Sequence, residues 1–180
     1  MRFTVIFLTL SLLLPNFKLD IDNSSISYTG SHPFHDWQGI TSQIEIITDC
    51  DMVNSDCGAT INVPVMSFIS GNENRDSNML FYVDGFSFPI IKISFSHLNI
   101  SNLLSRDKTV NFDGEIDFHG FKVMQEIPLF ITEESNIIFI RSDFSIKLNS
   151  FKIDRPSLLM VPIKNEIKID VNISGEFTQQ

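Results

Sequence analysis

Apolar and polar residues alternate along much of the chain after residue 16, and this alternation is the strongest pattern in the sequence. Residues 167–174 give the longest run, and the same period recurs at 17–22, 91–96 and 112–118. A period of two places the apolar side chains on one face of a strand and the polar side chains on the other. Strands with a single apolar face are typical of antiparallel sheets, so the pattern predicts an antiparallel all-β protein.

Further strands are expected at residues 26–29, 40–48, 59–68, 121–131, 137–141 and 144–151. Residues 72–81 are predicted to form one short helix, because polar N-cap candidates precede its apolar end. About eight or nine strands with one helix fit either a sandwich or a closed barrel. Small barrels of about eight strands either fill their interior or hold one ligand, and alternation alone does not separate these cases.

The first residues have the pattern of a secretory signal peptide. Arg2 precedes an apolar run of about 12 residues that ends at Leu14. A membrane-spanning helix needs roughly 20 residues, and the run lacks the alternation of a first strand. We therefore expect residues 1–16 to direct export, with cleavage near residues 15–18. Residues 17–180 are expected to form one periplasmic or secreted domain without a stable membrane anchor.

Two cysteines, Cys50 and Cys57, flank a polar segment that is typical of a hairpin loop. An exported protein reaches an oxidising compartment, so a disulfide across this loop is expected. Two free thiols are the alternative. A metal site is disfavoured, because two cysteines without a second pair or a nearby histidine do not complete a tetrahedral shell.

Charge and composition narrow the range of partners. The formal net charge is −9, from 22 acidic and 13 basic residues. A negative surface repels phosphate backbones, so nucleic acid is not expected as a partner. Charge alone also disfavours docking on an anionic bilayer. The 17 phenylalanines, against one tryptophan and two tyrosines, suit an apolar core or the wall of an apolar cavity.

Catalytic and metal chemistry find little support in the sequence. His32, His35 and Asp36 are the best metal candidates, but Pro33 places them in a loop without helical spacing. A solvated loop, or Trp37 packed at the mouth of a barrel, is the preferred interpretation. No Gly-x-Ser-x-Gly nucleophile motif is present. We therefore predict no catalytic residue, no metal ligand and no cofactor, and the protein is not expected to be an enzyme.

The segments at residues 70–80, 88–95 and 113–121 contain motifs that, in this order, resemble those of the YceI family of polyisoprenoid-binding, lipocalin-like proteins. Residues 70–80, Ser-Gly-Asn-Glu-Asn-Arg-Asp-Ser-Asn-Met-Leu, are similar to the family's strand end with Gly-Asn, two variable residues, Arg-Asp and a short helix. Residues 88–95 place Phe-Pro before an alternating strand, and residues 113–121 contain a His-Gly hairpin, as in the family. The resemblance extends from about residue 17 to residue 177.

This resemblance implies an antiparallel lipocalin-like barrel of about eight strands, with one short helix and a long hydrophobic tunnel. Family members are periplasmic or secreted and bind isoprenoid chains, such as quinone tails or polyprenyl compounds. The expected function is the binding, and the carriage or storage, of an isoprenoid or other long-chain lipid. The alternative is a solid-core β-sandwich interaction protein at the cell surface with no small ligand. The oligomeric state is open, with a dimer as one alternative.

Strand parity selects the candidates for the tunnel wall, and the same residues would be core if the barrel were filled. These candidates are Tyr28, Val63, Phe95, Phe112, Phe118, Val123, Phe144 and Ile146. Arg75, in the family-like segment, is the candidate anchor for a ligand head group at the tunnel mouth. The preferred interpretation of Arg75 is nevertheless an ion pair with Asp76 that fixes the helix to the barrel.

Overall fold

The computed structural model describes the backbone of residues 15–51, 56–99 and 109–179, and the side chains of 17–50, 56–99 and 109–176. The predicted signal segment therefore lies outside the described residues, except for Pro15 and Asn16, which begin the first strand. The strands are β1 (Pro15–Leu19), β2 (Ser25–His32), β3 (His35–Thr41), β4 (Glu45–Asp51), β5 (Asp56–Pro64), β6 (Ile90–Asn99), β7 (Thr109–Phe118), β8 (Phe121–Glu134), β9 (Ile137–Lys147), β10 (Ser157–Leu158), β11 (Val161–Pro162) and β12 (Glu166–Gln179). The helix α1 covers Glu73–Tyr82, and short 3₁₀ turns lie at η1 (Ile21–Asn23), η2 (Val65–Ser67) and η3 (Leu148–Phe151).

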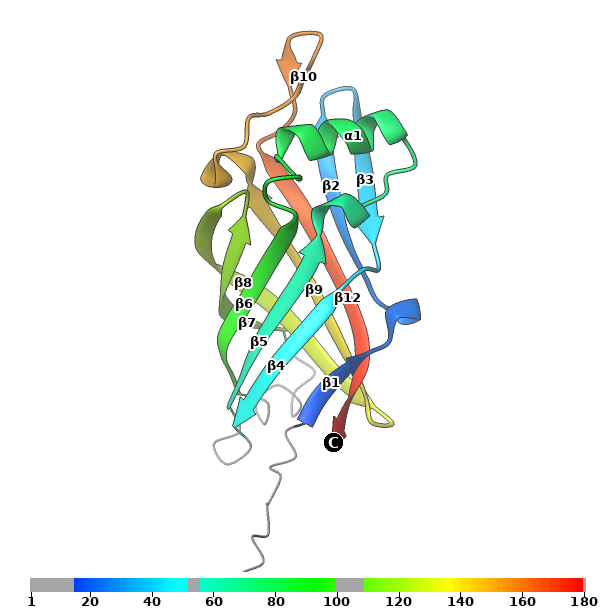
Figure 1. Ribbon diagram of the computed structural model, residues 1–180, viewed down its shortest axis with the longest axis vertical. Coiled ribbons are helices and arrows are strands. Elements are labelled where there is room, and N and C mark those ends of the chain that lie inside the picture. The colour runs from blue at the N-terminus through cyan, green and yellow to red at the C-terminus, as the bar shows by residue number, and fades with distance from the viewer. Residues whose placement is uncertain (1–14, 52–55, 100–108, 180) are drawn as a thin grey trace, which may run out of the picture.

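Ten of these strands form one curled antiparallel sheet, as the predicted lipocalin-like barrel requires (Figure 1). The order is β3-β2-β12-β9-β8-β7-β6-β5-β4, and β1 pairs with the far end of β12. The two edge strands, β3 and β4, are separated by only residues 42–44, so the sheet has to curl to bring its edges together. Beside this seam, Ile40 of β3 forms an isolated bridge with Ile69, which follows η2. The fold is thus a barrel and not two packed sheets, and the sandwich alternative is wrong.

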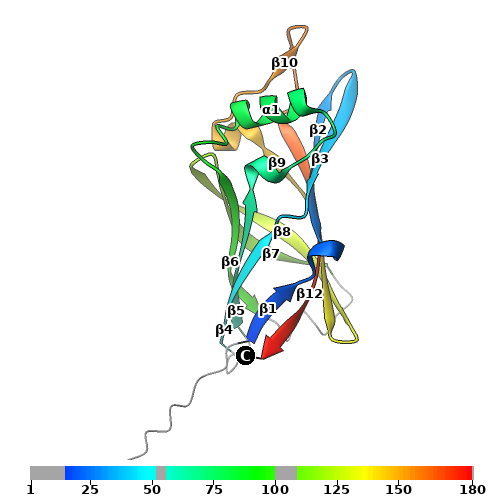
Figure 2. The ribbon, with the colours of Figure 1, turned by 45° about the vertical axis from the view of Figure 1, so that its right-hand side comes forward.

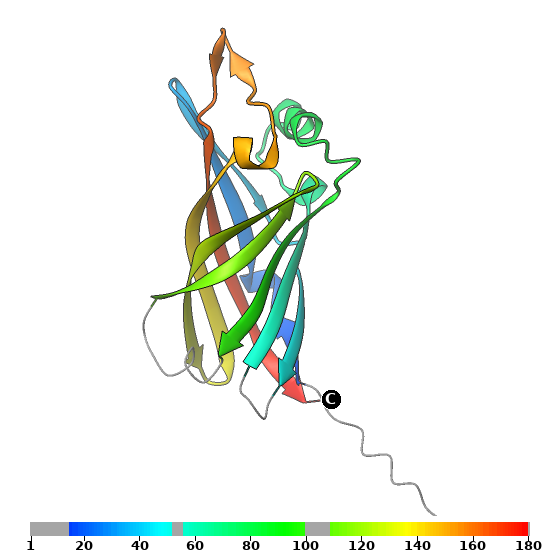
Figure 3. The same cartoon turned by 90° about the vertical axis from the view of Figure 1, so that its left-hand side faces the viewer.

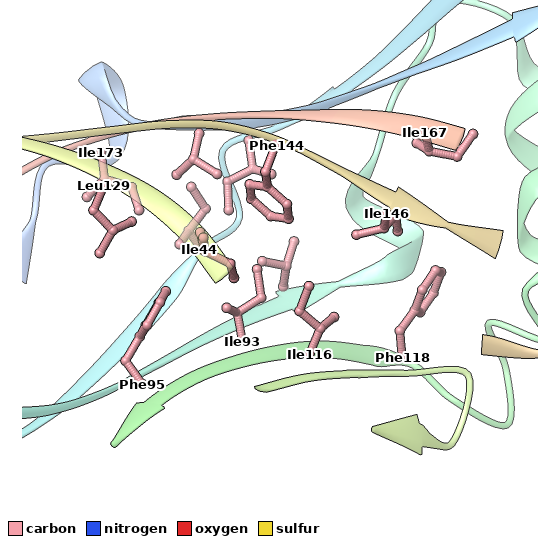
Figure 4. Close-up of a cluster of buried hydrophobic side chains, with 14 of the residues drawn as sticks. Ile44, Ile93, Phe95, Ile116, Phe118, Leu129, Phe144, Ile146, Ile167 and Ile173 are labelled. Atoms are coloured by element: carbon pink, nitrogen blue, oxygen red, sulfur yellow. The ribbon is translucent and has the colours of Figure 1, made fainter. Parts of the chain in front are cut away.

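The predicted alternation of inward and outward residues is confirmed along β12. Ile167, Val171 and Ile173 are buried, whereas Lys168 and Asn172 are exposed. Figure 4 shows Ile167 and Ile173 pointing toward the same interior as the buried residues of β6, β7 and β9. A period of two therefore builds the apolar interior of the barrel, strand by strand.

The predicted strand at residues 40–48 is interrupted, because β3 ends at Thr41 and β4 begins at Glu45. The Thr41 hydroxyl accepts a hydrogen bond from the backbone of Gln43 (2.9 Å) and bonds to the Ser67 hydroxyl (2.7 Å). These bonds replace strand pairing and turn the chain from one edge of the sheet to the other. Side-chain bonds of this local kind are a known competitor of ladder hydrogen bonds.

The two strands predicted at residues 137–141 and 144–151 are instead one strand, β9, followed by η3. Ser142 and Asp143 lie between the two predicted strands, but the Ser142 hydroxyl is buried and donates to the carbonyl of Pro128 (2.6 Å). Asp143 is exposed on the outer face. The strand therefore continues, because each polar side chain has either a partner or solvent. Similarly, the strand predicted at 59–68 ends at Pro64, where η2 begins.

The predicted helix is confirmed and lies across one end of the barrel (Figures 1 and 2). Its N-cap Asn72 accepts a hydrogen bond from the backbone of Arg75 (3.0 Å), which satisfies one of the free amides of the first turn. The Asp76 carboxylate accepts from the backbone N–H of Ser70 (3.1 and 3.2 Å) and so ties the helix to the preceding loop. We call this the upper end of the barrel; it also carries the β10–β11 hairpin and the closed end of the β2–β3 hairpin (Figure 3).

Candidate functional site

A cavity of about 430 Å³, the upper cavity, lies beneath α1 at the upper end of the barrel. Its inner wall consists of interior residues from the strands, among them Phe118, Ile146 and Ile167 (Figure 4). His35, Asn74 and Leu158 also line it and are exposed, so the cavity reaches the surface at this end. Apolar concavities of this size, with a few polar groups near the opening, are the usual form of a small-molecule site.

The helix contributes one face to the roof of the upper cavity. Arg75, Asn78, Met79 and Tyr82 line it and are spaced as i, i+3, i+4 and i+7. Residues with this spacing share one side of a helix, so the sequence contained a signal for this set beyond Arg75. The roof is thus part apolar and part polar, whereas the inner wall at Phe118, Ile146 and Ile167 is apolar.

Two aromatic side chains on the β2–β3 hairpin form a flat wall at the mouth. Tyr28 pairs across the strands with Gly39, and Trp37 pairs with Gly30. A Cβ atom at either glycine would overlap the opposite ring, so each ring lies directly over a glycine backbone. The glycines therefore let both rings lie against the sheet, which leaves the space in front of them to the cavity.

The Tyr28 hydroxyl is buried and has no hydrogen-bond partner within the described structure. Burial, with a smaller contribution from the Asp76 carboxylate, raises the pKa of Tyr28 from 10.0 to about 12. The Arg75 guanidinium and the Trp37 indole act to lower this pKa, but neither has the geometry of a hydrogen bond to the hydroxyl. A buried hydroxyl without a partner costs free energy, so this group is available to a polar atom of a ligand.

Arg75 lies at the cavity and forms no ion pair among the described residues. The preferred interpretation of Arg75, an ion pair with Asp76, is therefore wrong: Asp76 accepts hydrogen bonds from the Ser70 backbone instead. The guanidinium keeps its donors free for a group at the mouth. Tyr28 and Arg75 are thus two of the polar groups that line the upper cavity.

The structure separates the eight predicted wall residues into three groups. Tyr28, Phe118 and Ile146 line the upper cavity with Arg75. Phe95 lines a second, smaller cavity of about 90 Å³ toward the other end of the barrel, the lower cavity. The remaining residues line neither cavity: Val63 and Phe144 are buried core, and Phe112 and Val123 are half-buried and pack against it.

A layer of buried residues, the belt, separates the two cavities. Each belt residue comes from a different strand and lines neither cavity, and each is at most 8% exposed: Val63, Ile93, Ile116, Ile127, Phe144 and Val171. Figure 4 shows Ile93, Ile116 and Phe144 between the residues of the two ends. The expected tunnel is therefore interrupted in the middle of the barrel by packed side chains.

The predicted disulfide between Cys50 and Cys57 is confirmed. The two residues face each other across β4 and β5, and both side chains are buried. Residues 52–55 of the intervening loop lie outside the described residues. Cys57 lines the lower cavity, so the crosslink belongs to the end of the barrel away from the upper cavity.

The histidines considered as metal candidates have other roles. His32 is buried, and its Nε2 lies 3.1 Å from the carbonyl oxygen of Val161, which links the β2–β3 hairpin to the β10–β11 hairpin. The His35 ring packs near Trp37, with 5.7 Å between ring centroids. Among the described residues, no group of three or more His, Cys, Asp or Glu side chains is placed to hold a metal ion. In the same part of the chain, no helix has the length and apolarity needed to cross a membrane.

Comparison with known proteins agrees with this architecture. A crystal structure of Burkholderia cenocepacia BcnA matches with a TM-score of 0.74 at 14% identity, covering 87% of this chain and 99% of that chain. A polyisoprenoid binding domain from Saccharophagus degradans, implicated in plant cell wall breakdown, matches with a TM-score of 0.73 at 12% identity, covering 92% and 100%. The Campylobacter jejuni YCEI protein matches with a TM-score of 0.60 at 12% identity, covering 99% and 92%.

At these identities the structures demonstrate a shared fold. No curated protein matches the sequence significantly. The model of the YceI-like domain, however, matches residues 17–175, which is most of the chain. The protein therefore belongs to the YceI family.

Proposed function

We propose that this protein binds an isoprenoid or comparable long-chain lipid in the upper cavity, and that it carries or stores this ligand without chemically changing it. The observation that carries the proposal is the cavity itself, about 430 Å³ of apolar space that opens at one end of the barrel. Each Å² of apolar ligand surface removed from water contributes about 25 cal/mol, so such a site favours an apolar chain. The polyisoprenoid binding domain with the same fold is consistent with this ligand class.

The polar groups of the site suggest how the ligand is oriented. Tyr28 and Arg75 lie at the cavity with unused hydrogen-bonding capacity, and the inner wall at Phe118 and Ile146 is apolar. A quinone carbonyl or a polyprenyl phosphate would therefore face Tyr28 and Arg75, and the tail would point toward the belt. A buried donor is stabilised when it meets an acceptor. In this orientation the polar end of the ligand meets Tyr28 and Arg75, and its apolar tail meets the apolar wall.

Export to the periplasm or to the medium is part of the proposal. The Cys50–Cys57 disulfide supports it, because disulfides persist mainly in oxidising compartments. Fractionation of cells that express the whole chain should place the protein outside the cytoplasm, with residues 1–16 removed. Retention in the cytoplasm would contradict this part of the proposal without affecting the binding site.

The direct test is extraction of the purified protein with organic solvent, followed by mass spectrometry. Protein from a quinone-rich bacterial host should yield an apolar molecule in a fixed ratio to protein. Ile146→Trp, which fills the upper cavity, should lose this molecule, whereas Ile47→Trp, at an exposed position on β4, should retain it. Both variants should remain folded by circular dichroism.

A wild-type protein that yields no lipid, and that does not bind an added short-tailed quinone, would overturn the proposal. Equal retention by the Ile146→Trp and Ile47→Trp variants would place the ligand elsewhere. A lipid that is found only with Ile146 intact would support the upper cavity as its site.

A further inference from the structure

The β10–β11 hairpin extends beyond the rest of the molecule at the upper end. Figures 1, 2 and 3 show it from three sides as the outermost described part of this end of the barrel. Its strands pair Leu158 with Val161, which leaves Leu159 and Met160 as the two turn residues. Their side chains are 77% and 98% exposed, so an apolar pair occupies the most projecting point of this end.

The turn is unusual for its residues as well as for its exposure. Leu159 and Met160 both have positive φ, at 52° and 66°. Two-residue hairpin turns of this kind favour Asn-Gly, because other side chains are strained in the left-handed region. The sequence thus places two bulky apolar residues where both solvation and backbone conformation disfavour them. Such a combination of costs is typical of a functional site.

The hairpin is joined to the mouth of the upper cavity. Leu158 lines the cavity, and His32 Nε2 contacts the carbonyl oxygen of Val161. At the same end, the turn of the β2–β3 hairpin contains Phe34, which is 65% exposed. Exposed apolar side chains therefore stand on two hairpins around the opening through which a ligand would pass.

The charges near the hairpin differ in sign from those of the whole protein. Residues 147–164 contain four basic residues and one acidic residue, Asp154, whereas the chain has a net charge of −9. The four are exposed and lie before or after the hairpin: Lys147, Lys152, Arg155 and Lys164. Outside this segment, the acids of this end include Asp36 on β3, Glu73 and Asp76 on α1, Asp84 after it, and Glu166, which pairs with Lys147 at the start of β12.

We propose that the tip of this hairpin inserts into a lipid bilayer, so that the mouth of the upper cavity meets the membrane surface. An apolar tip with basic residues behind it matches the acyl region and the anionic headgroups of a bilayer in that order. A narrow convex tip suits a fluid surface, because it presents no extended face to a second protein. The inference extends the proposed function, since a water-insoluble ligand has to enter and leave through a membrane.

Vesicle flotation of ligand-free protein tests the inference without using the cavity. Wild-type protein should float with vesicles of phosphatidylcholine, and more strongly at low salt when phosphatidylglycerol is added. The variant Leu159→Asn/Met160→Gly installs the residues that the turn prefers, so its melting temperature should be equal or higher. Its vesicle partition should nevertheless fall by about tenfold or more, because two exposed apolar side chains are lost.

A control variant, Ile47→Ser/Met124→Ser, removes two exposed apolar residues from β4 and β8 and should bind vesicles as the wild type does. Failure of the wild type to float, or equal flotation of the hairpin variant, would overturn the inference. A wild-type dimer that the hairpin variant loses, without any vesicle binding, would assign the tip to self-association instead. The hairpin variant keeps the upper cavity, so lipid extracted from it would support the proposed ligand binding whether or not the variant binds vesicles.

Discussion

Tyr28 combines two properties that are rarely placed together in one side chain. Its ring lies over Gly39 and helps to form the cavity wall, while its buried hydroxyl has no partner among the described residues. The ring position depends on Gly39 across the strand, and the charges of Arg75 and Asp76 on α1 influence the pKa of the hydroxyl. Tyr28 thus contributes both to the wall of the upper cavity and to its polarity.

Replacing Tyr28 with Phe should change how stability depends on pH. The folded-state pKa, about 12, lies above the unfolded value of 10.0, so the folded protein holds this proton more tightly. Stability should therefore fall as the pH rises from about 10 to about 12, by on the order of 2 kcal/mol from this group. Denaturant unfolding at several pH values should show a smaller fall in Tyr28→Phe than in the wild type. Parallel curves would contradict the buried, unpaired hydroxyl.

The same substitution should weaken ligand binding without destabilising the ligand-free protein. Near neutral pH, Tyr28→Phe should leave the ligand-free protein as stable as the wild type or slightly more stable, because an unpaired buried hydroxyl is removed. Affinity for a quinone-type ligand should fall roughly twofold to tenfold, the range of one hydrogen bond. Fluorescence quenching by a short-tailed quinone measures this change. Unchanged affinity would exclude Tyr28 as a head-group contact.

Strands β6, β9 and β12 each contribute to the upper cavity, the belt and the lower cavity. In β6, Ile91 lines the upper cavity, Ile93 belongs to the belt, and Phe95 lines the lower cavity. Inward residues two apart along a strand therefore reach three successive levels of the interior. The belt sets the depth to which a ligand tail can enter from the upper end.

Phe144 is the largest residue of the belt, and its replacement by Ala should connect the two cavities. The lost packing should cost about 3–5 kcal/mol in denaturant unfolding, as for other large buried aromatic residues. Phe118→Ala should cost less, because that side chain already borders open space in the upper cavity. Phe144→Ala should also shift the extracted lipids toward longer tails. Equal costs for the two variants would show that both side chains have the same surroundings.

The alternation of the sequence predicted which residues face inward, but not which of them border empty space. Parity assigned Phe118 and Phe144 to the same wall, yet one lines a cavity and the other fills the belt. The empty volume inside the barrel depends on how side chains from six strands pack together, and the sequence of one strand does not determine this packing. The residues around Trp37 were expected to form a loop, with Trp37 packed at the mouth of a barrel as an alternative. Trp37 does line the upper cavity, but it lies on strand β3. The helix spacing of Arg75 and Met79 would have extended the predicted site further.

At the scale of the whole molecule, the two ends of the barrel are built differently. The upper end carries the cavity mouth, α1 and the two projecting hairpins. The other end carries the Cys50–Cys57 disulfide, and there β1 begins beside the end of β12 (Figure 1). The mouth of the upper cavity and the covalent crosslink are therefore separated along the length of the barrel.

Removing the disulfide should therefore affect stability but not the ligand. Cys50→Ala/Cys57→Ala should lower the free energy of unfolding by about 2 kcal/mol in the chain-entropy model for a short loop. Lipid retention under native conditions should match the wild type. Titration of denatured wild-type protein should detect no reactive thiol before reduction and two after it. Two reactive thiols in unreduced protein purified from the periplasm would contradict the crosslink.

The position of β12 has a consequence for the order in which the protein can fold during synthesis. β12 pairs with β9 on one side, and with β2 and then β1 on the other, so it joins the first strands of the chain to the rest of the sheet. It is also the last strand of the sheet to be made. Until it appears, the β2–β3 hairpin has no ladder connecting it to the strands from β4 to β9. Pairing between such distant segments is slow, so we expect the complete sheet to form only after β12 has been made.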